Sequence, residues 1–227
     1  MAEPGTLIRM LDLEIDAVLF DSDGVLVDSH DVVELAWRQL ATEFELDADR
    51  LTHEQAGVRA EDTLSRYLSG ECVVRAVARL EDLEVDLVGR VEAMPGAVSL
   101  IAQMGRFPCA IVTSGSRRLA TARWTQAGIE VSRVTVTADD VKRGKPDPAP
   151  YLRATQLLDV DPTRCVVFED SPSGGAAAFA LGGHVVAVGH QDWPTEPAIR
   201  IDHLGQVGFR TLAPPATSAR LTFHTPG

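Results

Sequence analysis

Short apolar runs alternate along most of the chain with longer stretches in which apolar residues recur every three or four positions. The runs are continuous rather than alternating, which is typical of strands that helices cover on both faces. The predicted strands are residues 17–20, 109–113, 134–137, 165–168 and 184–188. The predicted helices between and before the later strands are residues 96–104, 117–127, 149–158 and 173–181. This order predicts an α/β fold built on a doubly wound parallel sheet.

One interval breaks the alternation. About ninety residues separate the first two predicted strands, whereas a crossover needs only a dozen or so. Apolar positions in this interval recur at helical spacing. They are Leu64, Tyr67 and Leu68 on one face, and Val73, Ala76, Val77, Leu80, Leu83, Leu87 and Val88 on another. We therefore expect a small helical domain over residues 31–90, inserted into an α/β core of residues 1–30 and 91–208. Residues 209–227 are rich in Thr, Ser and Pro, and we expect a loosely ordered tail there.

Composition and charge indicate which kinds of binding partner the protein is not expected to have. The 227 residues include 21 basic and 33 acidic side chains, a formal net charge of −12, so binding to nucleic acid or an anionic membrane is not expected. Three widely spaced cysteines suggest neither a zinc knuckle nor a disulfide framework. The N-terminal residues lack an apolar stretch of signal-peptide length, and we expect a cytoplasmic protein. An anionic substrate would need a local positive site.

Polar side chains that could react with or bind a ligand follow the predicted strands. In open α/β sheets, ligands bind beyond the carboxyl ends of the strands, so these residues are expected to meet. The candidates are Asp21 and Asp23 after the first strand, Thr113 and Ser114 after the second, Lys145 in a loop before a helix, and Glu169 and Asp170 after the fourth strand. Taken singly, each has a plain structural alternative, such as a turn, a helix cap or a solvated side chain. A calcium loop is not supported, because Leu26 and Val32 stand where Gly and Glu would be needed.

The residue types together indicate phosphoryl chemistry. Carboxylates that converge on one edge repel one another unless a divalent cation lies among them, and all-oxygen ligands favour magnesium. A lysine, hydroxyl groups and a turn that contains glycine suit a phosphoryl group. One of the two aspartates, Asp21 or Asp23, would attack phosphorus while the other handles the proton of the leaving group.

Four segments together resemble the haloacid dehalogenase-like hydrolase superfamily. They are VLFDSDGVLVDS at 18–29, AIVTSGS at 110–116, TADDVKRGKPDPAPYL at 137–152 and VVFEDSPSG at 166–174. The resemblance implies a Rossmann-like core, and the helical insert resembles the type-one cap of that superfamily. Ser22 departs from the pattern, which usually has an apolar residue or threonine there. Dehalogenases of this group lack the second aspartate, so the presence of Asp23 argues against dehalogenation.

The same resemblance assigns roles. It implies that Asp21 is the nucleophile, which becomes an aspartyl-phosphate, and that Asp23 is the general acid and base. It implies that phosphate is bound by Thr113 or Ser114 and by Lys145. A magnesium ion would be held by Asp21, Asp170 and the backbone carbonyl of Asp23, with Glu169 close by.

The segments also resemble phosphatases that act on sugar phosphates and polyol phosphates. The expected partner is therefore a small phosphorylated metabolite, and Arg59 in the insert is a candidate contact for it. The alternative within the superfamily is β-phosphoglucomutase, which carries a histidine twelve positions after the first aspartate. Val33 stands there in this chain, and His30 is three positions early, which favours hydrolysis. A phosphoglycolate or nucleotide phosphatase and a non-catalytic phosphosugar-binding member remain further alternatives.

Overall fold

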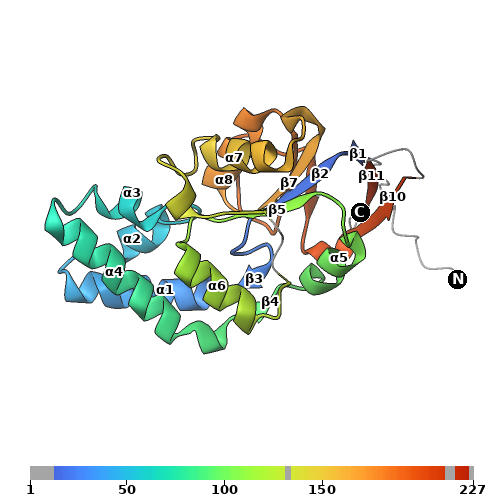
Figure 1. Ribbon diagram of the computed structural model, residues 1–227. Coiled ribbons are helices and arrows are strands. Elements are labelled where there is room, and N and C mark those ends of the chain that lie inside the picture. The colour runs from blue at the N-terminus through green and yellow to red at the C-terminus, as the bar shows by residue number, and fades with distance from the viewer. Residues whose placement is uncertain (1–12, 131–133, 213–217, 225–227) are drawn as a thin grey trace, which may run out of the picture.

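The computed structural model describes residues 13–130, 134–212 and 218–224 (Figure 1). Its centre is a six-stranded sheet in the order β6-β5-β2-β7-β8-β9, in which every neighbouring pair is parallel. The strands are β2 (Ala17–Phe20), β5 (Cys109–Val112), β6 (Val134–Val136), β7 (Cys165–Glu169), β8 (His184–Val188) and β9 (Ile199–Ile201). The prediction of a parallel α/β sheet is confirmed, and β9 is a strand that the sequence pattern did not reveal.

Helices cover both faces of this sheet, which explains why its strands are continuously apolar. The helices are α5 (Ala97–Met104), α6 (Arg117–Gln126), α7 (Ala149–Leu158) and α8 (Pro172–Leu181). Successive residues of β2 point to opposite faces: Ala17 and Leu19 belong to the core under α7 and α8, whereas Val18 and Phe20 belong to the core on the α6 side. All four side chains are at most 1% exposed.

The long interval after β2 forms four α-helices, as the periodicity predicts. They are α1 (His30–Glu43), α2 (Ala48–Glu54), α3 (Ala60–Leu64) and α4 (Glu71–Asp86), followed by the short 3₁₀ helix η1 (Val88–Arg90). We call residues 30–90 the insert. It has its own apolar core, in which Trp37, Leu40, Leu64 and Leu80 are buried. The chain enters and leaves it through the paired strands β3 (Val27–Asp28) and β4 (Glu92–Ala93), so the two connections lie side by side.

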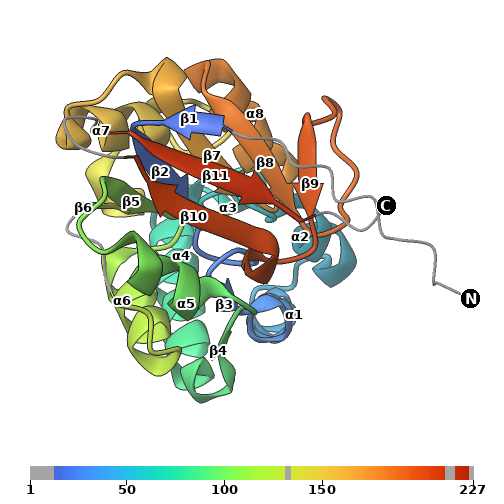
Figure 2. The ribbon, with the colours of Figure 1, turned by 90° about the vertical axis from the view of Figure 1, so that its right-hand side faces the viewer.

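The expectation of a loosely ordered tail is wrong for two segments. The strands β10 (Val207–Thr211) and β11 (Ala219–Phe223) form an antiparallel sheet with β1 (Leu13–Ile15) (Figure 2). Alternate residues of β11 are buried against the central sheet, and Phe223 lies 6.4 Å from Phe168 between ring centroids. The alternation of buried and partly exposed residues in β11 is not evident from the sequence, because the Thr, Ser and Pro content of the segment indicates a loop. Residues 213–217, 225–227 and 1–12 lie outside the described part of the chain.

None of the helices in the described residues has the length and apolar character needed to cross a membrane.

The other 3₁₀ helices are short connections: η2 (Ala138–Asp140), η3 (Pro162–Arg164) and η4 (Leu204–Gln206).

We predict that Phe223→Ala lowers the free energy of unfolding by about 3 to 5 kcal/mol, because it removes a fully buried aromatic ring. Thr222→Ala is the matched control on the opposite face of β11, and it is expected to cost less than about 1 kcal/mol. Urea unfolding followed by circular dichroism measures both values. Equal small losses would show that β11 is not part of the folded core.

Candidate active site

The predicted site residues of the α/β core meet at one edge of the central sheet. Strands β5, β2 and β7 are neighbours, so the loops that follow them lie together at their carboxyl ends. Asp21 follows β2, Thr113 follows β5, and Asp170 follows β7. Residues that are about 150 positions apart are thereby brought to one site.

A buried ion-pair cluster lies at the centre of this site. Nζ of Lys145 is 2.6 Å from Oδ1 of Asp21 and 2.5 Å from Oε1 of Glu169. The three residues are at most 5% exposed. The hydroxyl of Tyr151, on α7, donates a hydrogen bond of 2.7 Å to the same Glu169 oxygen. The cluster fixes Lys145 against the base of the site with almost no contact with solvent.

The pKa values of Asp21, Lys145 and Asp170 are all raised, but for different reasons. Burial, together with the negative charge of Glu169, raises the pKa of Asp21 well above its ordinary value. Burial alone would lower the pKa of Lys145, but the carboxylates of Asp21 and Glu169 outweigh it, so the pKa is raised and the ammonium stays protonated. Burial also raises the pKa of Asp170. One ammonium therefore faces three carboxylates, and the site has excess negative charge.

This charge excess and the donor atoms fit a divalent cation. One carboxylate oxygen each from Asp21, Glu169 and Asp170 lies within 4.8 Å of the others. Hard oxygen ligands of this kind suit Mg²⁺. The carboxylate of Glu169 already accepts hydrogen bonds from the backbone N–H groups of Asp170 and Ser171 and from the Ser171 hydroxyl, in addition to Lys145 and Tyr151. Asp21 and Asp170 are therefore the better candidates for direct metal ligands.

Gly24 allows the loop after β2 to approach Asp170. Its φ is +74°, in the left-handed region, and a Cβ at this position would lie 2.1 Å from Oδ2 of Asp170. The glycine of the Asp-x-Asp-Gly segment is thus required by the close contact between two of the loops that form the site.

The side chain of Asp23 is held by two donors on a single oxygen. Its Oδ1 accepts hydrogen bonds from the Ser29 hydroxyl at 2.5 Å and from Nη1 of Arg123 at 2.7 Å. The adjacent Ser22 is fully buried, and its hydroxyl accepts a hydrogen bond of 2.9 Å from the indole of Trp124. Ser22, which departs from the family pattern, therefore has a specific structural partner.

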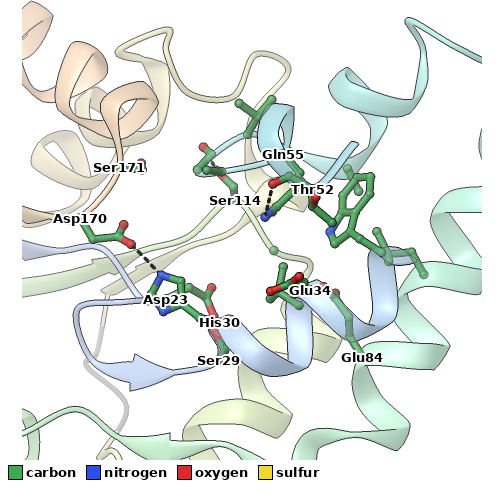
Figure 3. A pocket seen from close by; sticks show the side chains of 18 of the residues that line it. Asp23, Ser29, His30, Glu34, Thr52, Gln55, Glu84, Ser114, Asp170 and Ser171 are labelled. Atoms are coloured by element: carbon green, nitrogen blue, oxygen red, sulfur yellow. Dashed lines mark hydrogen bonds and ion pairs between the residues drawn. The ribbon is translucent and has the colours of Figure 1, made fainter. Parts of the chain in front are cut away.

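A cavity of ≈ 560 Å³ lies between the insert and the sheet edge. Figure 3 shows the side chains that point into it. The core contributes Asp21, Asp23, Ser114, Arg123, Asp170 and Ser171, and the polar residues of the insert include His30, Glu34, Thr52, His53, Gln55 and Glu84. The cavity thus places the carboxylates of the core opposite a wall of the insert that mixes these polar side chains with apolar ones such as Val33, Trp37 and Leu80.

His30 lies beside the carboxylate of Asp170. Its Nε2 is 3.4 Å from Oδ2 of Asp170, as the dashed line in Figure 3 shows. The hydrogen bond to Asp170 raises the pKa of His30, against the effect of its burial.

The two predicted hydroxyl ligands have different surroundings. Ser114 lines the cavity, and its hydroxyl donates a hydrogen bond of 2.9 Å to the carbonyl of Gly57 in the insert. Thr113 is buried, and its hydroxyl accepts a hydrogen bond of 3.0 Å from the backbone N–H of Gly115. Of the two residues, Ser114 is therefore the one that lines the cavity, whereas Thr113 forms a hydrogen bond within its own loop.

Arg59 does not have the predicted contact with the cavity in this conformation. It forms a bidentate pair with Asp62 and donates to the backbone carbonyls of Val141 and Lys142, and it is not among the described residues that line the cavity. The reason is geometric: Arg59 caps the N-terminus of α3, and its side chain contacts the loop that precedes Lys145. It joins the insert to the core at this point.

Sequence reasoning missed several residues of the site. They are Ser29, Tyr151, Ser171, Glu84 and Arg123. One signal was present for Arg123, because it falls on the apolar face of α6 with Leu119, Ala120 and Trp124, which are buried. An arginine on the buried face of a helix requires a partner elsewhere in the fold.

Comparisons with known proteins identify the family to which this chain belongs. A profile of the family described as haloacid dehalogenase-like hydrolase matches residues 15–183. Hexitol phosphatase A of Escherichia coli is 41% identical over 175 residues, which cover 75% of this chain and 81% of that protein. Glycerol-1-phosphate phosphohydrolase 2 of Saccharomyces cerevisiae is 31% identical, covering 81% and 78%. The crystal structure of a β-phosphoglucomutase from Clostridium difficile matches with a TM-score of 0.75 at 23% identity, covering 85% of this chain and 92% of that one.

Glu84 generates a prediction about pH. It is 6% exposed, and burial raises its pKa to about 7 although Arg123 lies nearby. A carboxyl group with a raised pKa in the folded state stabilises the fold most at low pH, and this contribution is lost as pH rises from about 4.5 through 7. We predict that the unfolding free energy of Glu84→Gln minus that of the wild type increases by about 2 to 3 kcal/mol as pH rises from 5 to 8.

Urea unfolding of both proteins across this pH range measures the difference. Asp86→Asn, on an exposed residue of the same helix, is the control and is expected to leave the pH dependence unchanged. A difference between Glu84→Gln and the wild type that stays constant with pH would show that Glu84 is ionised throughout.

Proposed function

Because the chain belongs to the haloacid dehalogenase-like hydrolase family and is a phosphoric monoester hydrolase, we propose that it dephosphorylates a small phosphorylated sugar or polyol. In this proposal the reaction requires Mg²⁺ and passes through an aspartyl-phosphate. The observation that carries it is the buried contact between Lys145 and Asp21 at the base of a polar cavity. A carboxylate that can serve as the nucleophile lies beside a fixed positive charge in this arrangement, which supports the proposal.

The proposed reaction has two displacements. A carboxylate oxygen of Asp21 attacks phosphorus, the bond to the leaving oxygen breaks, and Asp23 gives that oxygen a proton. Water then attacks the same phosphorus, Asp23 takes its proton, and the bond to Asp21 breaks to release inorganic phosphate. Lys145, which contacts Asp21, and Ser114, which lines the cavity with Asp21, are proposed to bind the phosphoryl oxygens during both steps.

The metal requirement follows from the charge of the site. Asp21 and Asp170 would hold Mg²⁺ with the backbone carbonyl of Asp23, and Glu169 would remain close by while it orients Lys145. When bound, the ion neutralises charge on the carboxylates and on the phosphoryl oxygens.

The insert is proposed to act as a cap that selects the substrate. It already contacts the core through Ser114 and Gly57 and through Arg59 and the carbonyl of Val141. A closed cavity excludes water other than the one that reacts. The polar side chains of Glu34, Thr52 and Gln55 are suited to hydroxyl groups of a sugar or polyol, and the cavity volume suits a ligand of that size.

The identity of residue 33 favours hydrolysis over a mutase reaction. Val33 lines the cavity, and its side chain has no group that can exchange a proton. A mutase must activate a hydroxyl of its sugar for a second phosphoryl transfer, so another residue would have to supply the base.

The first test is phosphate release from a panel of hexitol phosphates, glycerol phosphates and sugar phosphates, with and without Mg²⁺. We expect release that stops when EDTA removes the metal and returns when Mg²⁺ is added. The panel includes β-glucose 1-phosphate, with formation of glucose 6-phosphate followed in parallel. Glucose 6-phosphate without free phosphate would indicate a mutase, and no reaction on any substrate would indicate a binding protein.

Asp21→Asn is expected to reduce turnover by at least about 10³-fold, because it replaces the nucleophile with an amide of the same shape. Asp192→Asn, which changes an exposed carboxylate outside the cavity, is the control and is expected to retain wild-type turnover. The covalent step would be assigned wrongly if the Asp21 variant kept substantial magnesium-dependent turnover.

A further inference from the structure

Arg123 is a buried cation with an incomplete set of partners. Its side chain is 4% exposed, and its Nη1 donates to Oδ1 of Asp23 at 2.7 Å. Nη2 lies 3.4 Å from Oε1 of Glu84, and neither Nη2 nor Nε has a hydrogen-bond acceptor among the described residues. Burial of a charged group is costly unless it is paired. The contact with Asp23 therefore offsets part of the cost of burying the Arg123 guanidinium.

The contact leaves one oxygen of Asp23 for chemistry. Both donors, Ser29 and Arg123, are bound to Oδ1, whereas Oδ2 accepts no hydrogen bond from any residue that the structure describes. Asp23 is also one of the residues that line the cavity. The anchored oxygen fixes the orientation of the carboxylate, and the other oxygen can exchange a proton with a ligand.

The next residue of α6 strengthens this arrangement. Trp124 donates its indole N–H to the hydroxyl of Ser22, which precedes Asp23 in the loop after β2. Two consecutive residues of α6 therefore hold two consecutive residues of the loop, one through its hydroxyl and one through its carboxylate. This pairing orients the loop more firmly than either contact alone.

Glu84 connects the same contact to the insert. It lies on α4, and both it and Arg123 line the cavity. At the rim, α4 and α6 are already joined by the ion pairs of Arg118 with Glu81 and Asp82. A buried pair is weak support for stability, because desolvation offsets much of the attraction. The inner pair is therefore not needed to hold the two helices together.

We propose that Arg123 is a positioning residue for the acid–base carboxylate of Asp23, and that Glu84 of the insert holds the Arg123 guanidinium in place. Proton transfer then depends on whether the insert is docked against α6. The proposal rests on the function proposed above, in which Asp23 protonates the leaving oxygen.

The test exploits the leaving group. An alkyl phosphate, taken as the best substrate of the panel, needs a proton on its leaving oxygen, whereas p-nitrophenyl phosphate releases a weak base that does not. The constant kcat/KM reports the steps up to formation of the aspartyl-phosphate. We expect Arg123→Gln to lower kcat/KM by about 10²-fold for the alkyl phosphate and by less than about 3-fold for p-nitrophenyl phosphate. Arg123→Lys, which keeps the charge, is expected to restore part of the loss.

Three further variants separate positioning from folding. Glu84→Gln is expected to cause a smaller loss with the same selectivity, and the double variant Arg123→Gln/Glu84→Gln is expected to equal Arg123→Gln, because Glu84 acts through Arg123. Arg118→Gln, which breaks only the rim contact between the same helices, is the matched control and is expected to change neither substrate. Activity on p-nitrophenyl phosphate shows directly that a variant is folded.

The outcomes are distinct. An equal loss on both substrates, or no loss on either, overturns the role of Arg123 while leaving the phosphatase proposal intact. Additive losses in the double variant overturn the part played by Glu84. A wild-type protein that releases phosphate from neither substrate overturns the proposed function instead.

Discussion

The buried ammonium of Lys145 is the constraint on which the rest of the site depends. It contacts Asp21 after β2 and Glu169 at the end of β7, and neither carboxylate has another cation as close among the described residues. The parallel order of β2 and β7 sets the distance between these two carboxylates, and Tyr151 on α7 completes the hydrogen bonds of Glu169. A sheet edge that would otherwise carry only repelling charges is thus compatible with a stable fold. The remaining negative charge makes the same edge suitable for a divalent cation.

The insert completes the site from the opposite side. Some of its contacts with the core fall on the loops that carry the candidate catalytic residues, as with Gly57 and Ser114, and Arg59 and the loop before Lys145. Others join α4 to α6. The left-handed φ of +71° at Gly57 and the 2.1 Å that would separate its Cβ from the Ser171 hydroxyl show how closely the insert approaches. In the proposals above, substrate selection and proton transfer both depend on the position of this helical insert.

The family relationship and the geometry of the site support each other, but they give different information about the protein. Family membership establishes the hydrolase chemistry, and the similarity to phosphatases of hexitol and glycerol phosphates narrows the substrates to be tested. The cavity adds detail that the motifs do not give: Val33 in its lining, polar side chains from α1 and α2, and Arg123 against Asp23. In a fold that serves several reactions, function is argued from site features of this kind.

The sequence by itself determined the parallel sheet, the helical insert and the meeting of Asp21, the Thr113–Ser114 pair, Lys145 and Asp170, because apolar periodicity and strand-end position are local properties of the chain. The substrate contact expected of Arg59 and the loose tail were not supported, since the first depends on which way α3 faces and the second on pairing between β11 and the distant β1. Only the tertiary structure decided that Arg123 meets Asp23, a hundred positions earlier, and Glu84 across a domain contact. Local patterns specify which face of an element is buried, whereas the partner of a buried charge is set by how distant elements pack.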